Sequence, residues 1–234
     1  RGRNMGKKQK KVLIAVPAYD GRVCCDFSVA IAEIFRLAAD NNCELFLQYW
    51  MYDSLVHIAR NSLVACAYER EVDELVFIDA DQGFTAEAFF AVLSHPVDAV
   101  GIPVRNKTQS EGYNIRPHEV SRHKYDVSLK LLEVEAIGTG FLRLSKYALQ
   151  ALRDSSPTYG DDHRMICNTQ IIGGQLISED IQICDKLRAA NIKVYADVAH
   201  TCTHFGTHKW EGNYKDYYVR ELLALKAEYQ REDK

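Results

Sequence analysis

Two carboxylates, Asp79 and Asp81, stand one residue apart directly after the apolar run 75–78. A short, apolar, β-prone run is typical of a buried parallel strand. Open α/β sheets bind ligands at the carboxyl ends of such strands. Mg²⁺ and Mn²⁺ take oxygen ligands, usually one or two carboxylates together with substrate phosphates. The pattern therefore indicates a metal-bridged diphosphate site, although an aspartate at a strand end is as well explained by helix capping.

A second candidate group directly follows the first expected strand, which covers residues 12–16. It comprises Pro17, Ala18, Tyr19, Asp20, Gly21 and Arg22. This stretch would place an aromatic ring, a carboxylate and a guanidinium in the crevice at the end of the sheet, where a nucleotide would lie. Taken alone, the stretch is better explained as a turn that closes a βα unit.

Two further candidates lie on expected helices. Arg60 falls at the edge of the apolar face of a helix over 55–69, where it either extends its charge to solvent or forks onto a phosphate. Ser178 is a natural N-cap for a helix over 179–190, and Glu179 and Asp180 suit its positive end. The functional interpretation is that one of these carboxylates is a general base for an acceptor hydroxyl, reached past Gly173-Gly174.

Alternating elements would position these residues. Strands are expected at 12–16, 44–49, 75–78 and 97–100, with helices at 26–39, 55–69 and 85–94, Thr85 being the N-cap of the last. This order predicts a parallel, doubly wound half. Beyond it we expect strands at 127–136, 141–144 and 193–196, and helices at 146–153, 179–190 and 214–229. The polar stretches 106–125 and 154–174 are predicted to be loops, the first mobile.

The composition excludes several classes of protein. The 234 residues carry a net charge of −3, so no basic field indicates nucleic-acid binding. No apolar run approaches the length of a membrane span. The seven cysteines are odd in number and scattered, which favours a reduced intracellular protein over a disulfide scaffold. We therefore expect a cytoplasmic protein, in the host cytoplasm if it is viral.

Five blocks, taken in order, resemble the GT-A glycosyltransferases, particularly a group found in viruses, phages and bacteria. The blocks are Ala59-Arg60-Asn61-Ser62-Leu63-Val64, Val76-Phe77-Ile78-Asp79-Ala80-Asp81-Gln82-Gly83-Phe84, Gly138-Thr139-Gly140-Phe141-Leu142, Ser178-Glu179-Asp180 and His204-Phe205-Gly206. The resemblance extends over roughly residues 12–206, and chlorella-virus members of the group look especially close in size. The resemblance implies one GT-A domain over 1–234 with a mixed, mainly parallel α/β sheet. Its nucleotide-binding half is about 10–105, its acceptor-binding half about 106–212, and a terminal helix follows at 213–234.

The resemblance also implies roles for individual residues. Asp81 would ligate Mn²⁺ or Mg²⁺, Asp79 would contact the metal or the ribose, and His204 would touch the metal or the diphosphate. Asp180, of the Glu179-Asp180 pair, would be the catalytic base in an inverting reaction. The donor site would comprise Pro17, Ala18, Tyr19, Asp20, Arg22, Arg60, Asn61, Asp79, Ala80, Asp81, Gly138, Thr139 and Gly140. Gln82, where many relatives have an apolar residue, and the sequence Ile181-Gln182-Ile183-Cys184 after the acidic pair depart from the family pattern.

These roles predict a metal-dependent hexosyl- or pentosyltransferase that moves a sugar from a nucleotide-sugar donor, with UDP favoured, to a hydroxyl acceptor such as a glycan. Inversion is favoured, and a retaining mechanism stays open if Asp180 faces away from the acceptor. The loop 106–125 would close over the donor. A nucleotidyltransferase is the nearest rival, although the chain has only Gly21 after its first strand. The residues are also compatible with a non-catalytic nucleotide-sugar-binding module and with a phage glycosyltransferase that acts on modified DNA.

Overall fold

A nine-stranded mixed sheet forms the centre of the protein, in a computed structural model that describes residues 8–118, 124–160 and 163–232. The strand order is β2-β1-β3-β9-β5-β14-β8-β6, and β7 also pairs with β8. The strands are β1 (Lys10–Ala18), β2 (Cys43–Met51), β3 (Glu74–Ile78), β5 (Ala99–Gly101), β6 (Ile115–Pro117), β7 (Lys124–Asp126), β8 (Leu131–Ile137), β9 (Phe141–Ser145) and β14 (Val194–Asp197). One continuous sheet thus draws strands from both halves of the chain.

Most strands of this sheet run in one direction. The pairs β1–β2, β1–β3 and β5–β14 are parallel, and only β8 and β9 run against the others. The predicted mixed, mainly parallel α/β sheet is confirmed. Strands β3 and β5 run in the same direction but are not neighbours, because β9 is inserted antiparallel between them. Pairing order is a long-range property that the alternation of elements does not fix.

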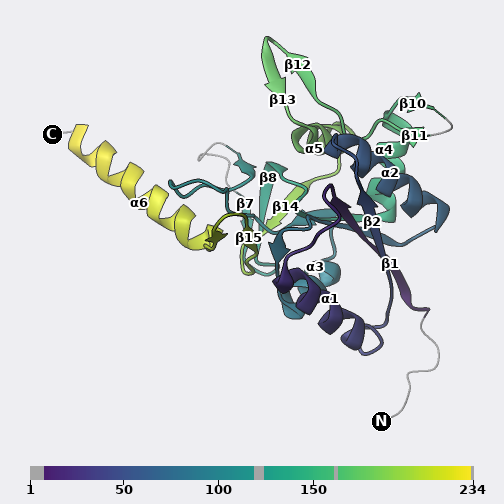
Figure 1. The fold of residues 1–234 in the computed structure, drawn as a ribbon. Helices are drawn as coiled ribbons and strands as arrows, with labels where there is room; N and C mark the ends of the chain where they lie inside the picture. The colour runs from purple at the N-terminus through teal and green to yellow at the C-terminus, as the bar shows by residue number, and fades with distance from the viewer. Residues whose placement is uncertain (1–7, 119–123, 161–162, 233–234) are drawn as a thin grey trace.

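Helices cover both faces of the sheet (Figure 1). They are α1 (Cys25–Leu37), α2 (Val56–Glu69), α3 (Ala86–Ser94), α4 (Lys146–Ser155), α5 (Glu179–Ala189) and α6 (Tyr214–Glu232). Helices α1 and α3 pack on one face in one apolar cluster, and α2, α4 and α5 pack on the other face in a second cluster. As predicted, Thr85 caps α3 by accepting a hydrogen bond of 3.1 Å from the Ala88 N–H.

Successive side chains point to opposite faces of the sheet, which explains why the central strands are continuous apolar runs in the sequence. In β1, Leu13 and Ala15 enter the cluster with α2, whereas Val12, Ile14 and Val16 enter the cluster with α1. All five side chains are fully buried. Because both faces of the sheet are covered, every position along these strands is better filled by an apolar residue.

Both predicted loops contain short strands. The stretch 106–125 includes β6 and the start of β7, with 119–123 outside the described residues, and 154–174 includes β10 (Thr158–Tyr159), β11 (His163–Arg164) and β12 (Gln170–Ile172). The strand expected from 127 begins only at Leu131. The Asp126 carboxylate explains the late start, because it accepts the N–H groups of Ser128 at 2.9 Å and Leu129 at 3.0 Å and so holds a turn.

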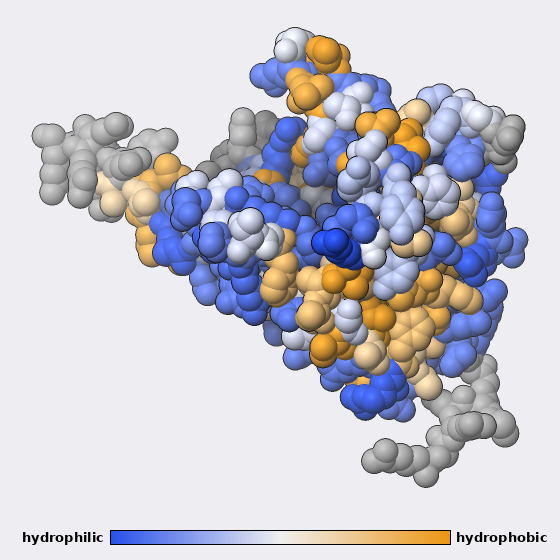
Figure 2. Space-filling model, in the orientation of Figure 1, coloured by the Kyte–Doolittle hydropathy of each residue, from blue (hydrophilic) through white to orange (hydrophobic). Residues whose placement is uncertain are grey.

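Three smaller features project from or border the sheet. Strand β12 pairs with β13 (Gln175–Ile177) in a hairpin that stands away from the body, as α6 does (Figure 1). Apolar side chains gather at the end of this hairpin (Figure 2), where Ile171 and Leu176 are exposed. Strand β15 (Thr203–Phe205) pairs with β4 (Gln82–Gly83) and with β16 (Lys209–Trp210).

Two further findings bear on the sequence-based expectations. All seven cysteines are free thiols. Within the described residues, no helix combines the length and the apolar character that crossing a bilayer requires.

Candidate active site

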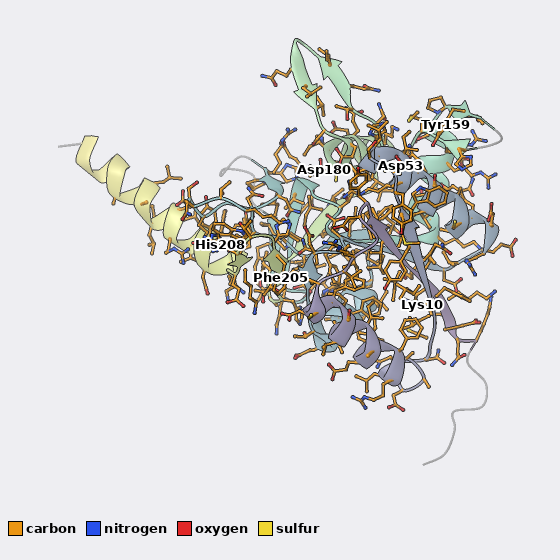
Figure 3. The ribbon with its side chains drawn as sticks, in the orientation of Figure 1. Lys10, Asp53, Tyr159, Asp180, Phe205 and His208 are labelled. Carbon is orange, nitrogen blue, oxygen red and sulfur yellow. The ribbon has the colours of Figure 1, made fainter. Side chains whose placement is uncertain are left out.

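A pocket of about 480 Å³ opens at the carboxyl ends of β1, β2 and β3. Figure 3 labels Lys10 at the opposite end of β1, and Asp53 and Asp180 towards the end where this pocket lies. The lining contains nine of the sequence-predicted site residues: Pro17, Ala18, Tyr19, Asp20, Arg22, Arg60, Asp79, Ala80 and Asp81. The parallel strands bring these residues together, because each strand ends at the same edge of the sheet.

Asp81 is the half-exposed carboxylate of the pocket and contacts two basic side chains. Its Oδ2 accepts a hydrogen bond from the Lys107 ammonium and lies 3.5 Å from Nε2 of His204. Burial alone raises the pKa of Asp81, but His204 and Lys107 outweigh it and lower that pKa to about 2. Asp81 therefore stays ionised across the physiological range and offers a charged oxygen to the pocket.

The short sheet β16-β15-β4 brings His204 to Asp81. His204 pairs with Gln82 in the β15–β4 ladder, and the Phe205 N–H donates to the Asp81 carbonyl at 2.9 Å. Nδ1 of His204 lies 2.7 Å from the Arg105 carbonyl oxygen. Since a carbonyl only accepts, Nδ1 must carry a proton, so Nε2, which faces Asp81, is the ring atom that would ligate a cation.

Gln82, which departs from the pattern of the GT-A enzymes that the sequence resembles, also contacts the Asp81 carboxylate. Its side chain is fully buried, and Nε2 donates to Oδ1 of Asp81 at 3.3 Å. Asp81 thus has one oxygen oriented by Gln82 and the other directed to Lys107 and His204.

Asp79 belongs to a separate, more buried ion-pair group centred on Arg60. The Arg60 guanidinium donates from Nη2 to Asp79 Oδ1 at 3.0 Å and from Nη1 to Glu179 Oε1 at 2.6 Å. Its side chain is only 6% exposed, so Arg60 does not extend its charge to solvent. Burial alone would lower the pKa of Arg60, but the neighbouring acids outweigh it and raise that pKa. Arg60 therefore fixes two acidic residues from opposite halves of the chain beside the pocket.

Asp180 lies at the first turn of α5, next to the residue that Arg60 holds. Its Oδ1 accepts from the Ser178 hydroxyl and, at 2.8 Å, from the Ile181 N–H. Ser178 occupies the expected N-cap position, but its hydroxyl binds Asp180 and makes no side-chain cap bond to the helix backbone. Asp180 is outside the lining of the pocket, and in the described part of the chain its Oδ2 has no hydrogen-bond partner.

Asn61 points away from the pocket into the protein. Its Oδ1 accepts the N–H groups of Ile166 at 3.1 Å and Cys167 at 2.8 Å, and its Nδ2 donates to the Cys167 carbonyl at 2.9 Å. Lys186 of α5 holds the same segment by donating to the carbonyls of Met165 and Ile166. The carboxamide of Asn61 is thus occupied in positioning residues 165–167.

The Gly138-Thr139-Gly140 turn joins β8 to β9 and does not line the pocket. A Cβ on Gly138 would lie 2.3 Å from Nδ2 of Asn114, so only glycine fits there. Thr139 is buried, and the Gly140 carbonyl accepts the Asp79 N–H at 3.0 Å. This turn therefore holds the backbone of Asp79 in place.

Several pocket residues escaped the sequence reasoning. Trp50, Asp53, Ser54 and Val56 follow or end β2, and their place after the second expected strand was an available signal. Val23, Cys24, Ala59, Phe205 and Gly206 complete the lining. Lys107, which is outside this lining, belongs to the loop 106–125 that was expected to close over the donor, but no sequence pattern paired it with Asp81.

The residues suit a divalent cation that substrate phosphates help to hold. Within the described ranges, no group of three histidine, cysteine, aspartate or glutamate side chains is arranged to bind a metal ion. Asp81 and His204 alone converge, since Asp79 turns one oxygen to Arg60. One or two protein ligands, completed by phosphates and water, are the usual arrangement for Mg²⁺.

Comparisons with known proteins address the fold. No protein-family model and no curated protein sequence matches the chain. Among solved structures, protein A197 from STIV is similar with a TM-score of 0.52 and 16% identity, over 85% of this chain and 86% of that one. This likeness supports the fold alone.

Two glycosyltransferase structures are similar at lower scores. One is a mutant of the Drosophila β1,4-galactosyltransferase 7 in complex with manganese, UDP-Gal and xylobiose, with a TM-score of 0.46 and 10% identity over 80% of this chain and 65% of that one. The other is involved in glycosylation of the major capsid of PBCV-1, with a TM-score of 0.36 and 11% identity over 66% of this chain and 72% of that one. Both TM-scores are too low to establish a shared fold by themselves. The sheet and the A197 likeness together confirm the predicted α/β fold with a mixed, mainly parallel sheet.

Proposed function

We propose that this protein is a metal-dependent glycosyltransferase that transfers a sugar from a nucleotide-sugar donor to a hydroxyl acceptor. The observation that carries the proposal is the pocket at the ends of β1 and β3, which joins an aromatic and polar loop to an ionised Asp81. The loop residues Tyr19, Asp20 and Arg22 suit a base and ribose. The carboxylate and His204 suit a cation on a diphosphate.

The donor half of the mechanism follows from charge. When the sugar leaves, negative charge develops on the nucleoside diphosphate, and a divalent cation at the pocket would stabilise that charge as a Lewis acid. Asp81 and His204 would hold the cation, Mn²⁺ or Mg²⁺. Arg60 keeps Asp79 oriented at the edge of the pocket, where it would contact the ribose or the cation.

The acceptor half of the mechanism rests on Asp180. Glu179 is engaged by Arg60, so Asp180, with Oδ2 unpartnered in the described residues, is the better general base of the pair. It would take the proton of the acceptor hydroxyl as the oxygen attacks the anomeric carbon, which inverts the configuration. A glycan is the acceptor we favour, and a UDP-sugar the donor, both on the resemblance to GT-A enzymes.

The same proposal covers the organisation and setting of the protein. Residues 10–105 would form the nucleotide-binding half of one domain, and 106–212 the acceptor-binding half. We place the enzyme in the cytoplasm, because the seven scattered cysteines favour a reducing compartment. We expect no nucleic-acid partner, because the net charge is −3.

The first test is thermal stability with UDP-, GDP- and dTDP-sugars, each with and without Mn²⁺. A ligand that binds the folded state raises the melting temperature, and the rise grows with ligand concentration relative to its dissociation constant. We expect a Mn²⁺-dependent rise with one nucleotide. No rise with any of them, at millimolar concentrations of ligand, would contradict a donor site.

Asp180→Asn tests the proposed base. We expect it to keep the donor-induced rise in melting temperature while turnover falls by about 10²–10⁴-fold, the usual loss for a general base. Asp185→Asn, farther along the same helix, is the matched control and should keep its turnover. Unchanged turnover in Asp180→Asn would exclude Asp180 as the base.

A further inference from the structure

The segment 104–113 folds back on itself beside the pocket and carries Lys107. Arg105 and Tyr113 form an isolated antiparallel bridge, and the Asn106 N–H donates to the Gly112 carbonyl at 2.8 Å. From this turn Lys107 extends across Gly206 to Asp81. A Cβ at Gly206 would lie 3.3 Å from Cδ of Lys107, so the lysine stem runs closely over this glycine.

The same segment is braced by the C-terminal part of the chain. Arg105 donates to the Glu211 carbonyl at 2.7 Å and lies over the Trp210 ring. Glu111 pairs with Arg220 of α6 at 2.5 Å. The ring of Tyr113 lies 5.3 Å from that of Tyr214. The turn that presents Lys107 is therefore anchored, while the lysine side chain itself is 36% exposed.

The ammonium of Lys107 and a bound cation would compete for the same position beside Oδ2 of Asp81. Lys107 binds Oδ2 of Asp81, the oxygen that also faces Nε2 of His204. Two like unit charges about 4 Å apart repel each other by roughly 1 kcal/mol in water and roughly 4 kcal/mol near a protein surface. A cation at Asp81 and His204 would therefore displace Lys107 from the carboxylate.

We propose that Lys107 is an internal counter-ion of Asp81 that competes with the divalent cation and sets the cation affinity of the pocket before the donor binds. The inference rests on the proposed function, since it takes Asp81 and His204 as the cation ligands. Lys107 neutralises Asp81 until a cation displaces it. The cation then binds well only when donor phosphates supply further ligands.

The direct test is calorimetric titration of the full chain with Mn²⁺ alone, without any nucleotide. Lys107→Met keeps the length of the side chain and removes its charge. We expect it to bind Mn²⁺ roughly 3- to 10-fold more tightly than the natural chain, because a half-exposed ion pair and a like charge no longer oppose binding. Lys107→Arg, which keeps the charge, should stay within about twofold of the natural chain.

Two controls locate the effect. Lys209→Met removes a neighbouring charge that pairs with Glu211 at 2.7 Å and Asp26 at 3.8 Å, away from Asp81, and should leave Mn²⁺ affinity unchanged. Adding Asp81→Asn to Lys107→Met should abolish the gain. The proposal is overturned if Lys107→Met binds Mn²⁺ no more tightly than the natural chain, or if Lys209→Met gives an equal gain.

The result separates this inference from the proposed function, because no sugar is present. A gain in Lys107→Met with no sugar transfer from any donor would keep the counter-ion and reject the glycosyltransferase. Transfer by the natural chain with no gain in Lys107→Met would keep the enzyme and reject the counter-ion.

Discussion

The two aspartates at the end of β3 are one residue apart yet have different surroundings. Asp79 pairs with Arg60, whose side chain is 6% exposed and which also holds Glu179. Asp81 pairs with Lys107, whose side chain is 36% exposed, and faces His204. One carboxylate is therefore fixed by a buried arginine that bridges two acids, and the other by a lysine that solvent or a ligand can replace.

This difference separates structural support from ligand binding within a single motif. Arginine donates through a rigid planar fork, whereas the lysine ammonium is a point charge on a flexible stem. The buried pair joins α2, β3 and α5 and so fixes the geometry of the pocket. In the exposed pair, the ionised Asp81 oxygen can exchange the Lys107 ammonium for another cation. The comparison predicts large stability effects around Asp79 and small ones around Asp81.

Arg60→Met should give the largest loss. Removing the arginine leaves two acids without their shared cation, and such a change in a buried pair costs about 3 kcal/mol or more of unfolding free energy. Urea denaturation of the variant measures it. Arg70→Met, an exposed arginine just after the same helix, should change the unfolding free energy by less than about 0.5 kcal/mol. Equal losses in the two variants would remove the distinction between the two aspartates.

Asn61→Ala should give the next largest loss, because three buried backbone groups of Ile166 and Cys167 lose their side-chain partner. Unsatisfied buried groups of this kind cost about 1–3 kcal/mol. Asn41→Ala, at an exposed asparagine, is the control for the same chemical change. If Asn61→Ala unfolds at the same urea concentration as the natural chain but loses donor binding, Asn61 contacts the donor after all.

Lowering the pH should reduce the free energy of unfolding only slightly through the ion pairs of Asp81. Its folded-state pKa of about 2 lies below the ordinary 3.8, so the stability it contributes is present above about pH 4 and is lost as the pH falls through 2. Because the Asp81 side chain is 39% exposed, solvent screening limits this contribution to below about 1 kcal/mol. The difference in unfolding free energy between the natural chain and Asp81→Asn should shrink between about pH 5 and pH 2. A difference that stays constant over this range would mean that the ion pairs of Asp81 do not stabilise the fold.

Local patterns predicted the elements, and the long-range contacts required the structure. Apolar runs placed β1, β2 and β3 within two residues of their observed bounds. Both faces of β1 and β3 are covered, and the edge strand β2 is half-buried. The insertion of β9 and the late start of β8 depend on pairing and on the Asp126 turn, which have no apolar signal.

The candidate site divides in the same way. The loop after β1 and the two aspartates were predictable, because strand ends meet at one edge of a parallel sheet. The partners of Asp81 were not predictable from spacing alone. His204 reaches it through the β4–β15 pairing, and Lys107 through a turn in a polar stretch that was predicted to be an irregular loop. Arg60 was expected either at the surface or on a phosphate, and its actual partner Glu179 is 119 residues away.

The cation site at Asp81 is the centre of the proposed mechanism, and breakdown of nucleotide sugars in the absence of an acceptor probes it without knowledge of the acceptor. With Mn²⁺ present, we expect the natural chain to hydrolyse one donor slowly to a nucleoside diphosphate and free sugar. A chelator should stop this hydrolysis, added Mn²⁺ should restore it, and Asp81→Asn should lack it. Release of a nucleoside monophosphate would show that a phosphate bond is broken, as in nucleotidyl transfer. Equal breakdown by Asp81→Asn, or indifference to the chelator, would contradict the cation site.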